Sequence, residues 1–249
     1  MLHLSNDVVR YNNGLNTVPL RKFTSIEMDL FWSICSKMKR KGVEQAVFNF
    51  DEIKEIAQYS QRGTEIFADD VRRMADKLGE LSFYYEDEDI WDKLMLFRRF
   101  TIDKKKETLT VKVSDEFEFI LNSIGSNFTR FELENMTNLS SSYTKELYRQ
   151  LMSHRDKTSR RGAWYVTVDD FRLLLNIPKS YRMSHIDERI FKQARLEFLT
   201  PSETGNCIFS VFKVEKVKAR KGNKISSFRI YFSEYQDPAF SVLGNIGEL

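Results

Sequence analysis

Apolar and polar residues follow two periods along the chain, one typical of amphipathic helices and one typical of strands. In the first half, apolar positions at helical spacing predict four helices, at 24–38, from 51, at 64–80 and at 114–121. Alternating or apolar stretches predict strands at 48–50, 81–85, 94–102 and 109–113. Thr24 and Glu27 fit a capping box, and Ser114 is a suitable N-cap.

The second half shows the same kinds of pattern in the same order. Helices are predicted at 142–152, 169–175 and 185–198. Strands are predicted at 163–168, 206–218 and 225–233, the last two joined by a turn at Gly222 and Asn223. Two further capping boxes are predicted, one beginning at Thr167 and one at Ser184.

The two halves match in register. Residues 48–56 align with 166–174 at an offset of 118, and Val71 and Ala75 align with Ile190 and Ala194 at an offset of 119. This register favours two copies of one unit over a chance likeness of two small α+β units. The unit, helix–strand–helix–turn–helix–hairpin, is a winged helix. We therefore expect an α+β fold of two tandem winged-helix domains, 1–122 and 123–249, joined at Ile124-Gly125-Ser126-Asn127.

Charge is distributed unevenly over these 249 residues. The net charge of +3 divides into −3 for residues 1–122 (19 Lys/Arg, 22 Asp/Glu) and +6 for 123–249 (20 Lys/Arg, 14 Asp/Glu). Residues 179–229 alone hold 12 basic and 5 acidic residues, net +7. Such a concentration indicates a polyanionic partner, and the alternative is an ordinary solvated basic surface.

The predicted helix 185–198 has the pattern of a DNA-reading helix. At 100° per residue, its apolar residues fall on one side, and His185, Arg189 and Lys192 fall on the other. Arg and Lys donate to guanine, and His donates or accepts at a base edge. Arg182 and Ser184 lie at the helix start, where phosphate is favoured. The alternative is a basic solvent-facing surface.

The second hairpin is unusually rich in cations, which include Arg229 and the predicted phosphate contacts Lys213, Lys216, Lys218, Arg220, Lys221 and Lys224. These charges repel one another unless phosphate neutralises them. Lysine on exposed strands also prevents aggregation, but that function rarely needs so many.

The first unit is predicted to bind DNA more weakly. Arg62, Thr64 and Arg73 are its candidate contacts, at the start and on the outer face of helix 64–80. Five acidic residues on the same helix would repel phosphate. We expect a secondary DNA contact combined with a protein–protein surface.

The sequence contains no pattern for catalysis or for a cofactor. Its three histidines never lie two apart, as a His-hydrophobic-His metal motif requires, and there is no P-loop motif. Two cysteines alone make neither a disulfide framework nor a four-ligand zinc site. There is no apolar run of about 20 residues and no secretion signal. We expect a cytoplasmic, bacterial, non-enzymatic protein without metal, cofactor or membrane association.

Several segments resemble the iteron-binding, theta-type plasmid replication initiators known as the initiator Rep protein family. The resemblance covers about 5–233 and is most specific at Phe128-Thr-Arg-Phe-Glu-Leu133, followed by Ser142-Tyr-Thr-Lys-Glu-Leu-Tyr-Arg-Gln-Leu151. Further segments are Asn6-Asp-Val-Val9, Phe23-Thr-Ser-Ile-Glu-Met-Asp-Leu-Phe31 and 166–178 with Tyr181. Residues 196–202 depart from the polar stretch usual in the family.

The resemblance implies two winged helices related by pseudo-twofold symmetry. It also implies a monomer that binds repeated origin sites, called iterons, mainly through its carboxy-terminal domain. Dimers formed through the amino-terminal domain would repress the chain's own gene, and a host initiator and helicase would follow at the origin. Two alternatives stay open: a transcriptional regulator that binds a palindromic operator, and a scaffold whose winged helices bind proteins.

Overall fold

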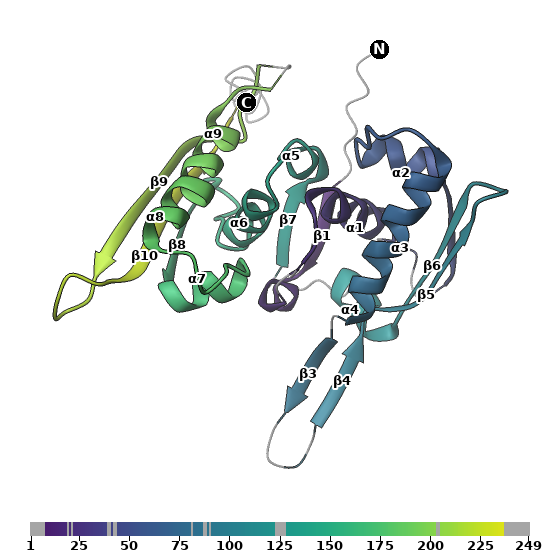
Figure 1. The fold of residues 1–249 in the computed structure, drawn as a ribbon, viewed down its shortest axis with the longest axis horizontal. Helices are drawn as coiled ribbons and strands as arrows, with labels where there is room; N and C mark the ends of the chain where they lie inside the picture. Colours follow the sequence, from purple (N-terminus) through teal and green to yellow (C-terminus); the bar gives the residue numbers. More distant parts are fainter. Residues whose placement is uncertain are drawn as a thin grey trace, which may run out of the picture. The chain divides into compact units, whose positions relative to one another are not determined.

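The computed structural model describes residues 8–236 except 19, 21, 39–40, 42–43, 81, 87–88, 90, 123–127 and 203–204. The chain forms two compact units, 1–149 and 150–249 (Figure 1). The expected boundary was 122/123, and the predicted junction at 124–127 lies outside the described residues. So do residues 1–7 and the tail after 236.

The first unit contains a winged helix built as the pattern predicts. Its elements are α1 (Ser25–Met38), β2 (Ala46–Asn49), α2 (Phe50–Ile56), α3 (Thr64–Glu80), β5 (Phe97–Asp103) and β6 (Thr108–Val113). The predicted capping box begins α1, because Thr24 N–H donates to Glu27 Oε2 (2.7 Å) and Glu27 N–H donates to Thr24 Oγ1 (3.3 Å). The sheet order is β2-β6-β5. Buried Phe50 and Phe67 join α2 to α3, with ring centroids 4.8 Å apart.

Additional elements enlarge this unit. They are β1 (Val8–Asn12), η1 (Asn13–Thr17), the hairpin β3 (Ser82–Glu86) and β4 (Trp91–Met95), α4 (Asp115–Asn122), β7 (Phe128–Glu132), α5 (Leu133–Thr137) and the start of α6 (Ser142–Ser153). The strand predicted at 94–102 is two strands, β4 and β5, which belong to different sheets. They divide at buried Leu96, whose carbonyl accepts Ser114 N–H at 3.0 Å.

Long-range contacts explain why residues 128–149 belong to the first unit. Strand β7 pairs antiparallel with β1 along its whole length. On α6, the buried Lys145 ammonium donates to Asp29 Oδ1 of α1 at 2.6 Å. The fully buried Arg149 guanidinium donates to the carbonyls of Leu15 (2.9 Å) and Val18 (3.0 Å). The partners are more than 100 residues apart in the sequence, so local apolar periodicity cannot predict these contacts.

The second unit repeats the winged helix with fewer additions. It comprises β8 (Arg161–Thr167), α7 (Val168–Leu174), a helix at 183–199, β9 (Phe209–Lys218) and β10 (Ile225–Glu234). The sheet order β8-β10-β9 has the connectivity of β2-β6-β5. Helices α2 and α7 begin 118 residues apart (Phe50, Val168), which is the offset read from the sequence. The predicted α+β fold of tandem winged helices is confirmed.

The helix at 183–199 differs from the uniform α-helix that the pattern predicts. It comprises α8 (Met183–Ile186), a π-helical segment η2 (Asp187–Lys192) and α9 (Gln193–Leu199). The π segment brings two consecutive apolar residues, Ile190 and Phe191, into the core. The face calculated at 100° per residue is therefore only approximate, since a π turn holds more residues than an α turn.

Candidate nucleic-acid interface

The second unit contains a helix-turn-helix formed by α7 and the helix at 183–199. Thr167 caps α7, because its Oγ1 accepts Asp170 N–H at 3.0 Å. Asn176 has a φ of 50°, in the left-handed region that Asn tolerates. Arg172 then fastens the turn by donating to the Tyr181 carbonyl at 2.7 Å. These contacts fix the angle at which the second helix leaves the turn.

One side of the helix at 183–199 is buried against its sheet (Figure 1). Ile186, Ile190, Ala194 and Phe198 are fully buried, and the Phe198 ring lies 5.1 Å from that of Phe212 on β9. The opposite side is exposed and carries Arg182, Ser184, Arg189 and Lys192, all predicted contacts. We call these four residues with His185 the reading face. This division leaves the cations at the surface while the helix stays anchored.

His185 has a structural contact as well as its place on the reading face. Its Nδ1 accepts the backbone N–H of Arg182 at 3.1 Å, and its ring lies 5.4 Å from that of Tyr181. The predicted cap at Ser184 is wrong, since the helix begins two residues earlier with Arg182 as N-cap. In the neutral ring this arrangement leaves Nε2 as the donor. His185 is half-buried, so only its outer edge is accessible.

Two cations of the reading face have partners that a ligand can replace. Arg189 donates to the Tyr181 hydroxyl at 2.9 Å, and its guanidinium lies 5.1 Å from the centre of the Tyr181 ring. Lys192 pairs with Glu188 at 2.8 Å, and this hydrogen bond raises the pKa of Lys192. Both members of the Lys192 pair are exposed, and exposed ion pairs contribute little stability. Phosphate or a base edge can therefore compete for both side chains.

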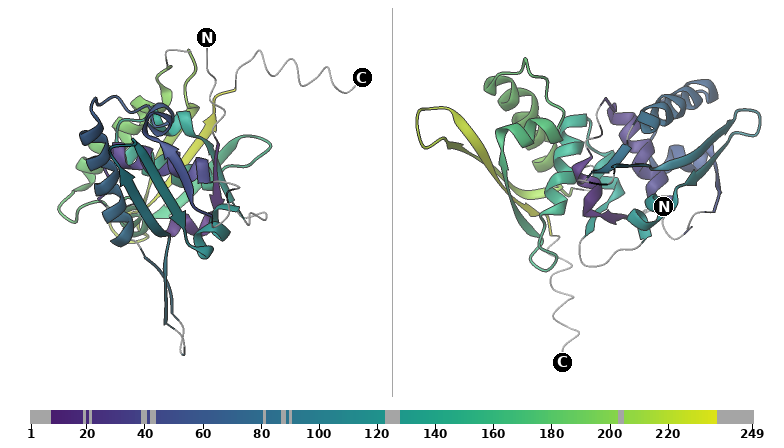
Figure 2. Two further views of the ribbon diagram at one scale, coloured as in Figure 1. Left: turned by 90° about the vertical axis from the view of Figure 1, so that its right-hand side faces the viewer. Right: turned by 90° about the horizontal axis from the view of Figure 1, so that it is seen from below.

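The β9–β10 hairpin is the wing of this unit and extends past its helices (Figure 2). Gly222 at its tip has a φ of 86°, which explains the glycine. Lys218 donates to Asn223 Oδ1 at 3.2 Å across the turn. The other predicted wing contacts at the tip, Arg220, Lys221 and Lys224, are all exposed. The tip thus carries four cations on a short ribbon.

Lys213 and Lys216 lie on opposite sides of the wing, because successive strand residues alternate. Lys216 faces the helix side and pairs with Asp187 of η2 at 2.6 Å. Lys213 faces the outer side and pairs with Glu215 at 2.6 Å, which raises the pKa of Lys213 and lowers that of Glu215. The predicted wing cations therefore do not form one continuous surface.

In the first unit, carboxylates occupy most of the predicted contacts. Thr64 donates to Glu107, and Arg73 pairs with Asp70. Arg62 is exposed just before α3. The structure does not bring these three residues into a cationic surface like the reading face.

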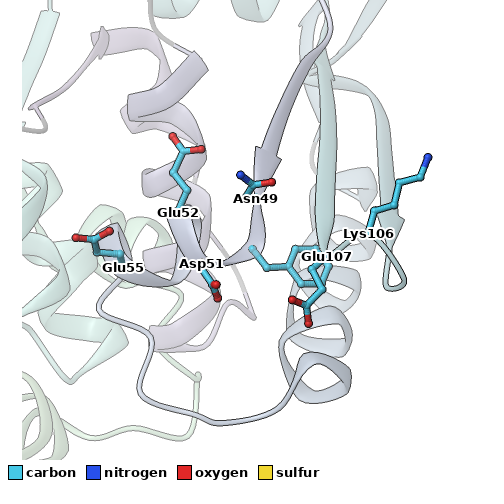
Figure 3. A pocket seen from close by; sticks show the side chains of 7 residues that line it. Asn49, Asp51, Glu52, Glu55, Lys106 and Glu107 are labelled. Atoms are coloured by element: carbon cyan, nitrogen blue, oxygen red, sulfur yellow. The ribbon is translucent and has the colours of Figure 1, made fainter.

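An acidic hollow of about 410 Å³ lies beside the start of α2 in the first unit (Figure 3). Its charged side chains are those of Asp51, Glu52, Glu55, Lys106 and Glu107. Two of the four carboxylates have cation partners, because Lys54 pairs with Asp51 and Lys37 pairs with Glu52. The carboxylates still outnumber the ammonium groups, which makes this surface unfavourable for phosphate. The hollow agrees with the acidic balance of the first half.

Two residues of the second unit were not among the contacts predicted from the sequence: an exposed cation, Arg195, and the partner of Arg189, Tyr181. Arg195 is exposed on α9, three residues after Lys192, and its guanidinium lies 5.9 Å from the Phe212 ring. The spacing from Lys192 was a signal that could have identified it. Tyr181, which holds Arg189, could not have been assigned that role, because the contact depends on the path of the turn.

The architecture defines a class: two winged-helix units, of which the second presents a cationic helix and a cationic wing. Sequence comparison assigns the family. Residues 8–152 match the family described as Initiator Replication protein, WH1, and residues 167–232 match Initiator Rep protein, WH2. The chain belongs to this family of initiator replication proteins.

Relatives agree with the assignment. A "Probable replication protein rep" of Bifidobacterium longum (strain NCC 2705) is 34% identical over 178 residues, which are 71% of this chain and 59% of that protein. The chain thus spans about three-fifths of that relative's length. The Pi initiator protein, solved in complex with iteron DNA, shares the fold with a TM-score of 0.72 at 15% identity, over 93% of this chain and 99% of Pi. Domains 2 and 3 of RctB match with a TM-score of 0.50 at 10% identity, over 86% of this chain and 84% of the RctB chain.

Neither a metal-binding cluster nor a membrane-spanning helix is present among the described residues. Within the described part of the chain, no three His, Cys, Asp or Glu side chains are grouped so that they could hold a metal ion. Among the same residues, no helix has the length and apolar character needed to cross a membrane.

Proposed function

We propose that this protein is a plasmid replication initiator that binds repeated duplex sites, iterons, at an origin. The observation that carries the proposal is the reading face, an exposed cationic side of a helix whose other side is fully anchored in the core. Family membership supports the role in replication. The solved complex of Pi, which has the same fold, supports iteron DNA as the ligand.

In this proposal the helix at 183–199 enters the major groove. Arg189 and Lys192 donate to base edges, while Arg182 and Ser184 bind phosphate at the helix start. The wing tip follows the adjacent backbone, where its cations supply affinity without sequence choice. Recognition needs no bond-breaking step, so we assign the protein no enzymatic activity.

We assign the first unit a secondary DNA contact through Arg62 and a protein surface at the β3–β4 hairpin. Trp91 and Met95 on this hairpin are 63% and 49% exposed, and they lie on one side of the strand. We propose that two copies dimerise there and that the dimer represses the chain's own gene from an inverted repeat. A host initiator and a helicase in the bacterial cytoplasm would act after the monomer binds.

The test is selection of binding sites from random duplex DNA, followed by footprinting at physiological salt. We expect one chain to protect an asymmetric site of about 20 base pairs, because each winged helix covers roughly one turn. Recovery of a palindrome bound only by two chains would favour a transcriptional regulator instead. Recovery of no sequence would overturn the proposal and point to a protein-binding scaffold.

A further inference from the structure

The outer face of the β8-β10-β9 sheet carries aromatic and cationic side chains that the reading face does not use. Strand register places Tyr165 opposite Arg229 and places Tyr231 opposite Lys213. Arg161 lies opposite Ser233, two residues beyond Tyr231. Directly paired residues and residues two apart point to the same side of a sheet. We call these five residues, Arg161, Tyr165, Lys213, Arg229 and Tyr231, the tyrosine face.

The tyrosine face is turned away from the helix-turn-helix. The intervening residues Trp164, Phe228 and Ile230 are buried on the other side, where Phe228 lies 5.0 Å from the Phe191 ring of the helix at 183–199. A duplex bound to that helix therefore does not cover the tyrosine face.

The two tyrosines form an ordered pair. Their ring centroids are 6.3 Å apart at 86°, an edge-to-face arrangement. A hydrogen bond with Tyr165 raises the pKa of Tyr231. The Arg229 guanidinium lies 6.0 Å from the centre of the Tyr165 ring, and Tyr165 is 64% exposed. A large aromatic ring is thus held at the surface beside a cation.

Charge on this face favours an anionic ligand. Arg161, Lys213 and Arg229 are exposed, and Glu215 is the carboxylate among them, paired with Lys213. Exposed rings beside cations are the combination that binds single-stranded nucleic acid, since each unpaired base offers a face for stacking and each phosphate a charge. Bases of an intact duplex are already stacked on their neighbours, so a duplex cannot use the tyrosine rings in this way.

We propose that the tyrosine face is a second nucleic-acid site that binds single-stranded DNA, with bases stacked on Tyr165 and phosphates near Arg161, Lys213 and Arg229. The site is separate from the reading face. The protein would therefore hold a duplex and an unpaired strand on different surfaces of the second unit.

The test uses the full chain and fluorescein-labelled oligothymidylate of about 16 nucleotides, with binding followed by anisotropy. We expect Tyr165→Ala to weaken oligothymidylate binding about tenfold, the loss of one stacked base, and Tyr165→Phe to retain it. Val211→Ala is the matched control, because Val211 lies opposite Ser233 on the same sheet face, is 49% exposed and carries neither a ring nor a charge. We expect no change for this variant.

Duplex binding separates this proposal from the proposed function. Tyr165→Ala should leave affinity for the selected duplex unchanged, and Arg189→Ala should leave oligothymidylate affinity unchanged. No oligothymidylate binding, equal affinity of Tyr165→Ala and wild type, or equal losses from Tyr165→Ala and Arg189→Ala would each overturn the second site. Failure of duplex selection alone would overturn the iteron proposal and not this one. Equal melting temperatures for all variants exclude unfolding as a cause.

Discussion

Arg189 illustrates how one contact prepares a side chain for recognition. The Tyr181 hydroxyl and ring hold the guanidinium in place before a ligand arrives, and Arg172 holds Tyr181 through its carbonyl. A side chain that is already ordered loses less rotamer entropy on binding. Arg189 is therefore the residue of the reading face on which we expect sequence choice to depend most.

We predict that Arg189→Ala weakens binding to the selected duplex by about 1–3 kcal/mol, with little change on a random duplex, because a base contact is lost. Anisotropy titrations of both duplexes at one salt concentration measure this. Arg98→Ala is the matched control, since Arg98 is also exposed but lies in the first unit, where it pairs with Asp115. Equal losses on both duplexes would mean that Arg189 meets only phosphate.

Asp29 and Lys145 form a buried ion pair that ties α6 to α1. Burial raises the pKa of Asp29 to about 7 from its ordinary value of 3.8, although the Lys145 ammonium opposes the shift. A carboxyl with a raised pKa in the folded state binds a proton that the unfolded chain has already released. This group therefore contributes stability below about pH 4, and the contribution is lost as pH rises toward 7.

We predict that the stability of wild type relative to Asp29→Asn declines between about pH 4 and pH 7. Urea denaturation of both proteins across this range gives the difference, in which other titrating groups cancel. Asp115→Asn serves as the control because Asp115 is largely exposed. A difference that is constant or rises with pH would show that Asp29 is ionised throughout.

At the scale of elements, the sequence predicted which helices and strands exist and in what order. It predicted less well the geometry of the helix at 183–199 and the side of the wing on which each lysine lies. Helical spacing identified α1, α3, α4 and α6, because apolar residues recur every three or four positions along each, although α1 and α6 bury nearly all of their residues. It missed η2, since π turns leave no periodic signal of their own. The consecutive pair Ile190 and Phe191 was the available clue. Strand alternation could also have placed Lys213 and Lys216 on opposite sides of the wing.

The cations at the wing tip should determine how strongly duplex binding depends on salt. Replacing Lys218 and Lys221 together by Ala should lower the slope of log affinity against log salt by about 2, if each meets one phosphate. Duplex titrations at several salt concentrations measure the slope. The control is Lys105→Ala with Lys106→Ala, which removes two exposed lysines from the hairpin of the first unit. An unchanged slope in the tip variant would place the wing outside the interface.

At the scale of the whole molecule, the repeat in the sequence predicted two winged helices but not where the units divide. The boundary depends on the β1–β7 pairing and on the Arg149 contacts with Leu15 and Val18, which join distant parts of the chain. The candidate reading face was predictable because it lies on one helix. The tyrosine face was not, since it needs the register of three strands.

Self-association is a property of the whole chain that the β3–β4 hairpin should control. A two-stranded hairpin is only marginally stable alone, and within the described residues it pairs with no further strand. We predict that Trp91→Lys with Met95→Lys weakens dimerisation at least about tenfold, as expected for loss of large apolar anchors. Analytical ultracentrifugation measures this. Val47→Lys, at a 58% exposed apolar site elsewhere in the unit, should not weaken it; equal dimer affinity in all three proteins would contradict the assignment.

The matching order of elements in the two units has an evolutionary consequence. When a gene carries the same fold twice, selection for one ligand needs to act on only one copy. Here Arg73 of the first copy pairs with a carboxylate, that of Asp70, whereas Arg189 on the corresponding helix of the second copy donates to a neutral hydroxyl, that of Tyr181. Under the proposed function, the origin sequence constrains the second copy, and the first copy is released to change its surface with each new partner. Across related plasmids, substitutions should therefore accumulate faster on the outer face of α3 than on that of the helix at 183–199.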